Sequence, residues 1–103
     1  MIVYEVNLFV QREIEAAFRD WLQGHVREIL ALPGFTGARL FEREDPPADA
    51  GEIVLCMQYL LRDAAALQDY YREHAARLRA DGQARFGARF RAERRVLREL
   101  PLG

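Results

Sequence analysis

The stretch Ile2-Val3-Tyr4-Glu5-Val6-Asn7-Leu8-Phe9-Val10 changes side-chain character at every second position. Its even-numbered residues are all apolar, whereas its odd-numbered residues mix apolar side chains with Glu5 and Asn7. A period of two, rich in β-branched and aromatic residues, predicts a strand because successive strand side chains point to opposite faces. We expect the even-numbered face of this strand to pack against helices.

The period changes to that of a helix directly after this strand. Over residues 12–32 the apolar positions fall at spacings of three, four and seven, and Trp21 and His25 are among them. Pro33 cannot continue a helix and Gly34 readily adopts a positive φ, so the pair predicts the end of this helix. We expect a second strand over residues 35–43.

The second half of the chain repeats this order. An acidic, double-proline loop over residues 44–51 precedes the most apolar run of the chain, residues 52–61, which predicts a central strand. Asp63 is a suitable N-cap for a second helix. We expect Asp81-Gly82 to break this helix, with one more turn over residues 83–86. The last strand should cover residues 88–100, at an edge of the sheet because it carries five Arg residues.

Strand, helix, strand, strand, helix, strand predicts an α+β, ferredoxin-like βαββαβ domain spanning residues 1–103. Its four-stranded antiparallel sheet carries both helices on one face. The opposite face would hold Glu5, Asn7, Phe9, Arg39 and Phe41 with part of the Cys56/Gln58 row. A bare, half-apolar face favours a partner, so we expect a homodimer that pairs two such faces. The charged residues Glu5, Arg39, Glu93 and Arg95 could form ion pairs inside or at the rim of this dimer, or they could be solvated edge charges.

The composition excludes several classes of protein. The 103 residues include 15 basic and 16 acidic ones, for a net charge of −1, which argues against a nucleic-acid binder. All the basic residues are Arg, so Schiff-base lysine chemistry is impossible, and the absence of Ser excludes a serine hydrolase. Cys56 is the only cysteine and cannot form an intrachain disulfide. Without a signal peptide or a membrane-length apolar run, we expect a soluble cytoplasmic protein.

Several short segments together resemble a known superfamily. They are Leu32-Pro33-Gly34-Phe35, Gly51-Glu52-Ile53-Val54-Leu55 leading into Tyr59, and Tyr70-Tyr71-Arg72-Glu73-His74. Their order and spacing resemble the dimeric α/β-barrel superfamily. The opening Met1-Ile2-Val3-Tyr4, the pair Trp21 and His25, and the segments Arg85-Phe86-Gly87 and Arg94-Arg95-Val96-Leu97 are similar to a bacterial family of unknown function within it.

The resemblance implies a homodimer whose two sheets pack face to face as a barrel. Members of the superfamily include cofactor-independent monooxygenases, haem-degrading enzymes, polyketide cyclases and isomerases. The haem-degrading members use an Asn on the first strand, which Asn7 matches, and a Trp and a His on the second helix. Tyr70 stands near that Trp position and Ala80 near that His position. The axial ligand is therefore missing, which argues against haem chemistry. We expect no cofactor.

The candidate ligand-binding residues are Tyr4, Trp21, His25, Tyr59 and His74. His25 lies one turn after Trp21 on the buried stripe and is the candidate general base, because an imidazole titrates near neutral pH. The competing interpretation, which residue statistics favour, is that both histidines and the aromatic residues are ordinary core residues. No spacing typical of a metal site is present, so we expect no metal.

Three functions remain open at this point. The first is an uncharacterised dimer that binds a small molecule in the cleft between sheet and helices. The second is a cofactor-independent monooxygenase or isomerase with His25 as base, and the third is an inert structural or interaction module.

One run of the chain is locally basic and contains Arg77, Arg79, Arg85, Arg89 and Arg91. Acidic residues are interleaved with this run or flank it, which is typical of a solvated face.

Overall fold

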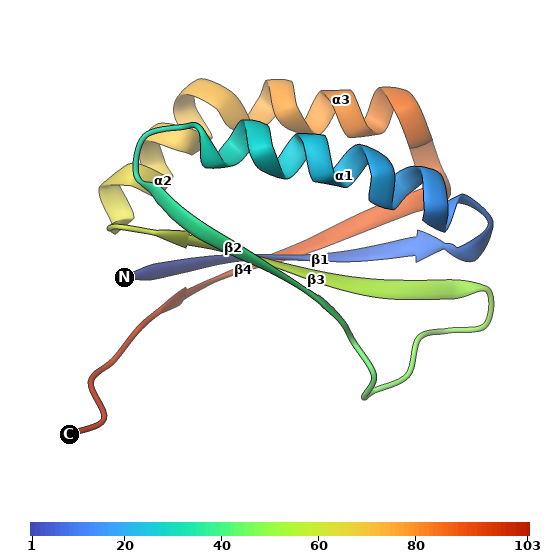
Figure 1. Ribbon diagram of the computed structural model, residues 1–103, viewed down its shortest axis with the longest axis horizontal. Helices are drawn as coiled ribbons and strands as arrows, with labels where there is room; N and C mark the ends of the chain where they lie inside the picture. Colours follow the sequence, from blue (N-terminus) through green and yellow to red (C-terminus); the bar gives the residue numbers. More distant parts are fainter.

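Four antiparallel strands form one sheet with all helices on a single face, as Figure 1 shows for the computed structural model of residues 1–103. The strands lie in the order β2-β3-β1-β4. This is the predicted ferredoxin-like α+β arrangement, with β3 central and β4 at an edge. The elements are β1 (Ile2–Gln11), η1 (Arg12–Ile14), α1 (Glu15–Leu30), β2 (Phe35–Glu42), β3 (Glu52–Leu61), α2 (Ala64–Tyr70), η2 (Tyr71–Ala75), α3 (Ala76–Phe86), η3 (Gly87–Arg89) and β4 (Phe90–Arg98).

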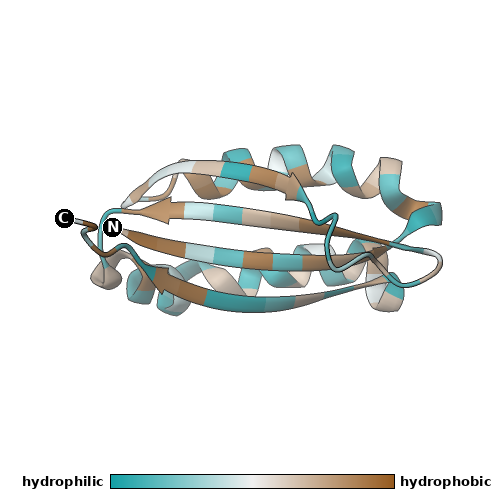
Figure 2. Cartoon of the chain, turned by 90° about the horizontal axis from the view of Figure 1, so that it is seen from below, coloured by the Kyte–Doolittle hydropathy of each residue, from teal (hydrophilic) through white to brown (hydrophobic).

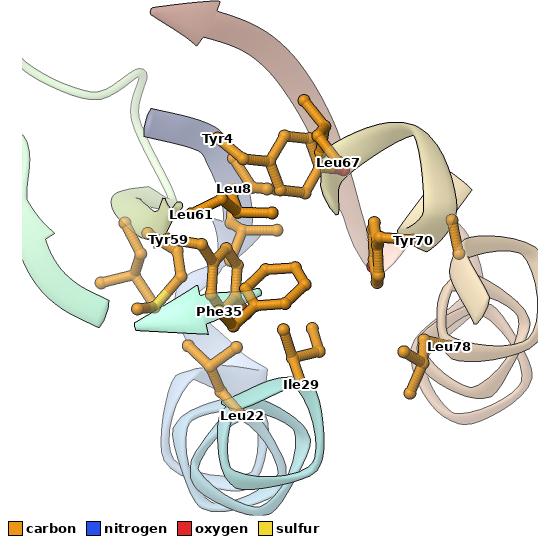
Figure 3. Packing of buried hydrophobic residues seen from close by; sticks show 14 of the residues in the cluster. Tyr4, Leu8, Leu22, Ile29, Phe35, Tyr59, Leu61, Leu67, Tyr70 and Leu78 are labelled. Carbon is orange, nitrogen blue, oxygen red and sulfur yellow. The ribbon is translucent and has the colours of Figure 1, made fainter. Parts of the chain in front are cut away.

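The core lies between the sheet and the helices. Every even-numbered residue of β1 belongs to it, as the alternation predicts. From the other side, Leu22 and Ile29 point from α1 toward Phe35 and Tyr59 (Figure 3). This burial of one apolar face of each element is the main force that stabilises the fold.

The first helical segment begins and ends close to the predicted positions, but its first turn is a 3₁₀ turn. Residues 12–14 form a 3₁₀ turn before α1 begins at Glu15. The helix ends at Leu30, and Gly34 then adopts a φ of +87°. A Cβ at this glycine would lie 2.4 Å from the Cβ of Ala66, so close approach to α2 also requires Gly34.

The predicted break at Asp81-Gly82 is wrong, because α3 runs through both residues to Phe86. Gly82 is buried where α3 meets α1, and a Cβ there would lie 3.0 Å from Cη2 of Trp21. The glycine therefore provides room for an aromatic ring instead of ending the helix. The last strand is also shorter than predicted, since the 3₁₀ turn η3 occupies residues 87–89 and the strand ends at Arg98.

The helix that follows Asp63 contains a wide turn that the sequence did not reveal. Asp63 caps it as predicted, with Oδ1 accepting a hydrogen bond of 2.9 Å from the backbone N–H of Ala66. The segment η2 is a π-helix between α2 and α3. The wide turn changes the spacing between successive buried residues of this helix. The next core residue after Tyr70 is therefore Ala75, whereas His74, which the helical period predicts for the buried side, is not in the core.

No helix covers the opposite face of the sheet, and only the loop between β2 and β3 crosses one end of it, as the view from below in Figure 2 shows. The strand register places Glu5, Gln58 and Arg95 side by side on this face. Glu5 is nonetheless only 2% exposed. Its carboxylate accepts hydrogen bonds from Asn7, Gln58 and Arg95, which hold its pKa at about 2 with the Arg95 contact contributing most. The predicted ion pair between Glu5 and Arg95 is confirmed.

Candidate functional site

A cavity of about 360 Å³ lies between the sheet and the two helical segments. Twelve of its 18 lining residues are hydrophobic, and they come from β1, β3, β4, α1, α2 and α3. The structure brings together four of the five predicted ligand-binding residues here, namely Tyr4, Trp21, His25 and Tyr59. This volume and mainly apolar lining are typical of sites that bind small molecules.

Trp21 and His25 form one wall of the cavity from adjacent turns of α1. Their rings stack with centroids 4.5 Å apart and planes 26° apart. Nε1 of Trp21 donates a hydrogen bond of 2.9 Å to Oδ2 of Asp81 on α3. Gly82, directly after this aspartate, leaves space for the indole ring. The position of Trp21 is therefore fixed by both helices.

His25 has a polar atom without a partner. Its Nδ1 is buried and makes no hydrogen bond within the chain. Desolvation lowers the pKa of His25 below 6.5, the positive charge of Arg94 acts in the same direction, and the carboxylates of Glu28 and Asp81 oppose both. The imidazole is therefore neutral at pH 7.

A cluster of tyrosines forms the other end of the cavity. The ring of Tyr4 lies 6.0 Å from that of Tyr59 and 5.8 Å from those of Tyr70 and Tyr71. Burial raises the pKa of Tyr70 to about 12 and raises the pKa of Tyr59 as well, so both phenols stay protonated at neutral pH. The hydroxyl of Tyr4 accepts a hydrogen bond of 3.0 Å from Nη2 of Arg79.

Exposed polar side chains line the cavity where it opens to solvent. They are Arg79 and Gln83 of α3 and Arg94 of β4. No Asp or Glu is among the lining residues. The opening therefore has a net positive charge, which attracts anions.

His74 does not join the other candidates, because it is not among the residues that line the cavity. It lies in the π-helical turn with its side chain 27% exposed, and its Nε2 lies 3.8 Å from Oε2 of Glu73. Sequence reasoning missed Arg79, Arg94 and Gly82. Arg79 was assigned to a solvated face, and no pattern in a chain with 15 basic residues, all of them Arg, distinguishes one that lines a cavity.

Nothing in the geometry suggests a bound metal. No group of three or more His, Cys, Asp or Glu side chains is close enough to hold an ion. Cys56 lies on the uncovered sheet face beside Glu5, away from the cavity, and burial raises its thiol pKa to about 11. None of the helices is long and apolar enough to cross a membrane.

Residues 1–100 match the family model described as "Domain of unknown function (DUF4286)". The chain belongs to this family. The predicted membership of a family of unknown function is therefore confirmed. No curated protein matches this DUF4286 chain.

Solved structures similar to the DUF4286 chain share its fold at low sequence identity. A putative antibiotic biosynthesis monooxygenase from Deinococcus radiodurans aligns with a TM-score of 0.72 and 12% identity, over 98% of this chain and 94% of that one. A point mutant of SnoaB, a cofactor-independent oxygenase from Streptomyces nogalater, aligns with a TM-score of 0.66 and 18% identity, over 98% and 96%. An ethyl tert-butyl ether D (EthD) family protein from Bacillus halodurans aligns with a TM-score of 0.66 and 19% identity, over 97% of this chain and 100% of that one. These structures confirm the predicted fold, and a shared fold does not carry function with it.

Proposed function

We propose that this protein binds a small molecule in the cavity between the sheet and the helices. The observation that carries the proposal is the mainly apolar cavity of about 360 Å³, in which Tyr4, Trp21, His25 and Tyr59 are brought together. Tyr4, Trp21, His25 and Tyr59 are the proposed binding residues. A cavity of this size also argues against the filled, inert module.

Protein-observed NMR with a library of neutral fragments tests this proposal. Fragments that bind are expected to shift the indole N–H signal of Trp21, the only tryptophan, and nearby backbone signals of α1 and α3. Ala92→Leu fills the cavity from β4 and should abolish these shifts. Ala84→Leu, on the exposed side of α3, is the matched control and should leave binding intact. Shifts that persist in Ala92→Leu, or a library without any binder, would overturn the proposal.

We also propose that two copies associate through the uncovered sheet face. Two large apolar side chains on this face, Phe41 and Leu97, are 45% and 37% exposed in the single chain. Pairing two copies of the same surface by a two-fold axis would cover both. Sedimentation at micromolar concentration should give a mass of twice 11.9 kDa, and Phe41→Arg should shift the protein to monomer. A monomeric wild-type protein contradicts the proposal.

We also propose a cytoplasmic location, which the presence of a single cysteine supports.

A second candidate function is that of a cofactor-independent monooxygenase or isomerase. The neutral, partly buried imidazole of His25 favours it, because a general base must be unprotonated at the working pH. Turnover of electron-rich phenols that is lost in His25→Gln, without loss of fragment binding, would support this function. A panel without any turnover would argue for binding alone.

A further inference from the structure

The three arginines among the residues that line the cavity differ in whether a carboxylate neutralises their charge. Nη1 of Arg91 lies 2.7 Å from Oε1 of Glu93, and its guanidinium stacks 3.7 Å from the ring centroid of Phe9 on the uncovered sheet face. Its charge is therefore neutralised away from the cavity. Arg79 and Arg94, by contrast, lie within 4.0 Å of no carboxylate.

The acidic residues nearest to the opening are already engaged elsewhere. Asp81 accepts hydrogen bonds from Trp21 and Arg85, and Glu28 pairs with Arg77 at 2.7 Å. Arg79 donates only to the neutral hydroxyl of Tyr4, and Arg94 has no hydrogen-bond partner on the chain. Two uncompensated cations thus stand at the open side of the cavity.

The aromatic walls of the cavity indicate which kind of group the inner part of a ligand would carry. Trp21, Tyr59, Tyr70 and Phe90 present aromatic surface on the inner side of the two guanidinium groups. Aromatic rings pack favourably on such surfaces, and a guanidinium binds the planar carboxylate group through two parallel hydrogen bonds. Arg79 and Arg94 come from α3 and β4, which both border the opening, and the charges of both act on Tyr70 and Tyr71, so the two arginines lie near the same part of the cavity.

Resting on the proposed small-molecule function, we propose that the cavity takes an aromatic carboxylate whose ring lies inside and whose acidic group binds Arg79 and Arg94. The ring packs among the aromatic walls, and the carboxylate stays at the opening, where it keeps part of its hydration. A neutral aromatic molecule of the same shape enters the same cavity but loses the charged hydrogen bonds.

The test compares 2-naphthoate with the neutral isostere 2-naphthamide by isothermal titration calorimetry at pH 7. Naphthoate is expected to bind about ten- to a hundredfold more tightly, the ratio that one or two charge-assisted hydrogen bonds give. Arg94→Gln should remove most of this advantage and leave naphthamide affinity unchanged. Arg94 is the better probe than Arg79, because it supports no other side chain. Arg62→Gln removes an exposed arginine that does not line the cavity and should leave both affinities unchanged.

The preference should also weaken as salt is raised from about 0.05 to about 0.5 M, on the order of a few-fold, because the two arginines are exposed. Equal affinities for naphthoate and naphthamide would overturn the carboxylate proposal while leaving small-molecule binding in place. The same holds for an acid preference that Arg94→Gln and Arg79→Gln both retain. Absence of binding by either probe, together with a fragment library without binders, would overturn both proposals.

Discussion

Replacing Glu5 by Gln tests the account of the uncovered sheet face most directly. The carboxylate of Glu5 accepts hydrogen bonds from the amides of Asn7 and Gln58 at 2.9 Å and 3.0 Å and from the guanidinium of Arg95. A glutamine at this position would turn its own NH₂ group toward one of these donors. We therefore expect Glu5→Gln to lower the free energy of unfolding at pH 6 by about 1–3 kcal/mol.

The magnitude also follows from the pKa of Glu5. A pKa lowered from 4.5 to about 2 corresponds to about 3 kcal/mol of stabilisation at neutral pH. The side chain of Arg95 is 66% exposed, so screening by solvent reduces this figure to about 1–2 kcal/mol. Since the folded pKa is the lower one, the stabilisation is complete above pH 4.5 and is lost as the pH falls toward 2.

Urea denaturation of the wild type and of Glu5→Gln at pH 6, 4 and 2.5 provides the measurement. The difference in unfolding free energy between the two proteins should shrink by about 1–2 kcal/mol over this range, because only the wild type loses the charge. Each pair is measured at one protein concentration, since association of two copies would add to stability. Glu13→Gln, an exposed residue outside any ion pair, is the control and should follow the wild type. A difference that stays constant from pH 6 to 2.5 would refute the reasoning.

Four further variants or measurements test other parts of the structure. Phe18→Ala should cost about 3–5 kcal/mol in urea denaturation, because the ring is 0% exposed, and a loss under about 1 kcal/mol would contradict its place in the core. Gly82→Ala should be destabilising despite a gain in helix propensity of about 1 kcal/mol, because its Cβ would meet Trp21 at 3.0 Å, and unchanged stability would show that the ring can shift. Asp63→Ala should cost about 1 kcal/mol through loss of the helix cap, measured in the same way. The Cys56 thiol, with a pKa raised to about 11, should react with a disulfide reagent at pH 8 at least about tenfold more slowly in the native protein than in urea.

The features that could be predicted from the sequence are those that depend on neighbours within one or two turns. The alternation in residues 2–10 correctly assigns the core face of β1, and the bounds of β3 agree with the apolar run 52–61. The cap at Asp63 was also predicted correctly. Periodicity and capping depend only on residues close together in the sequence, so they can be predicted without knowledge of the tertiary structure.

The errors arise where a distant segment changes the meaning of a local signal. Gly82 reads as a helix breaker, yet it lies inside α3 because Trp21, 61 positions earlier in the chain, occupies the space beside it. His74 fits a regular helical stripe, and the π-helical turn η2 moves it away from the cavity. An ion pair was expected for Glu5, but its burial was not, because Arg95 and Gln58 come from two neighbouring strands.

The sequence by itself determined the order of strands and helices, the face of β1 that enters the core and four of the residues that line the cavity. Only the tertiary structure decided that Arg79 and Arg94 stand uncompensated at its opening and that His25 Nδ1 has no partner. The reason is physical: a pattern of apolar residues reports which side of an element is buried. A cavity and its charge depend on side chains that six different elements bring together.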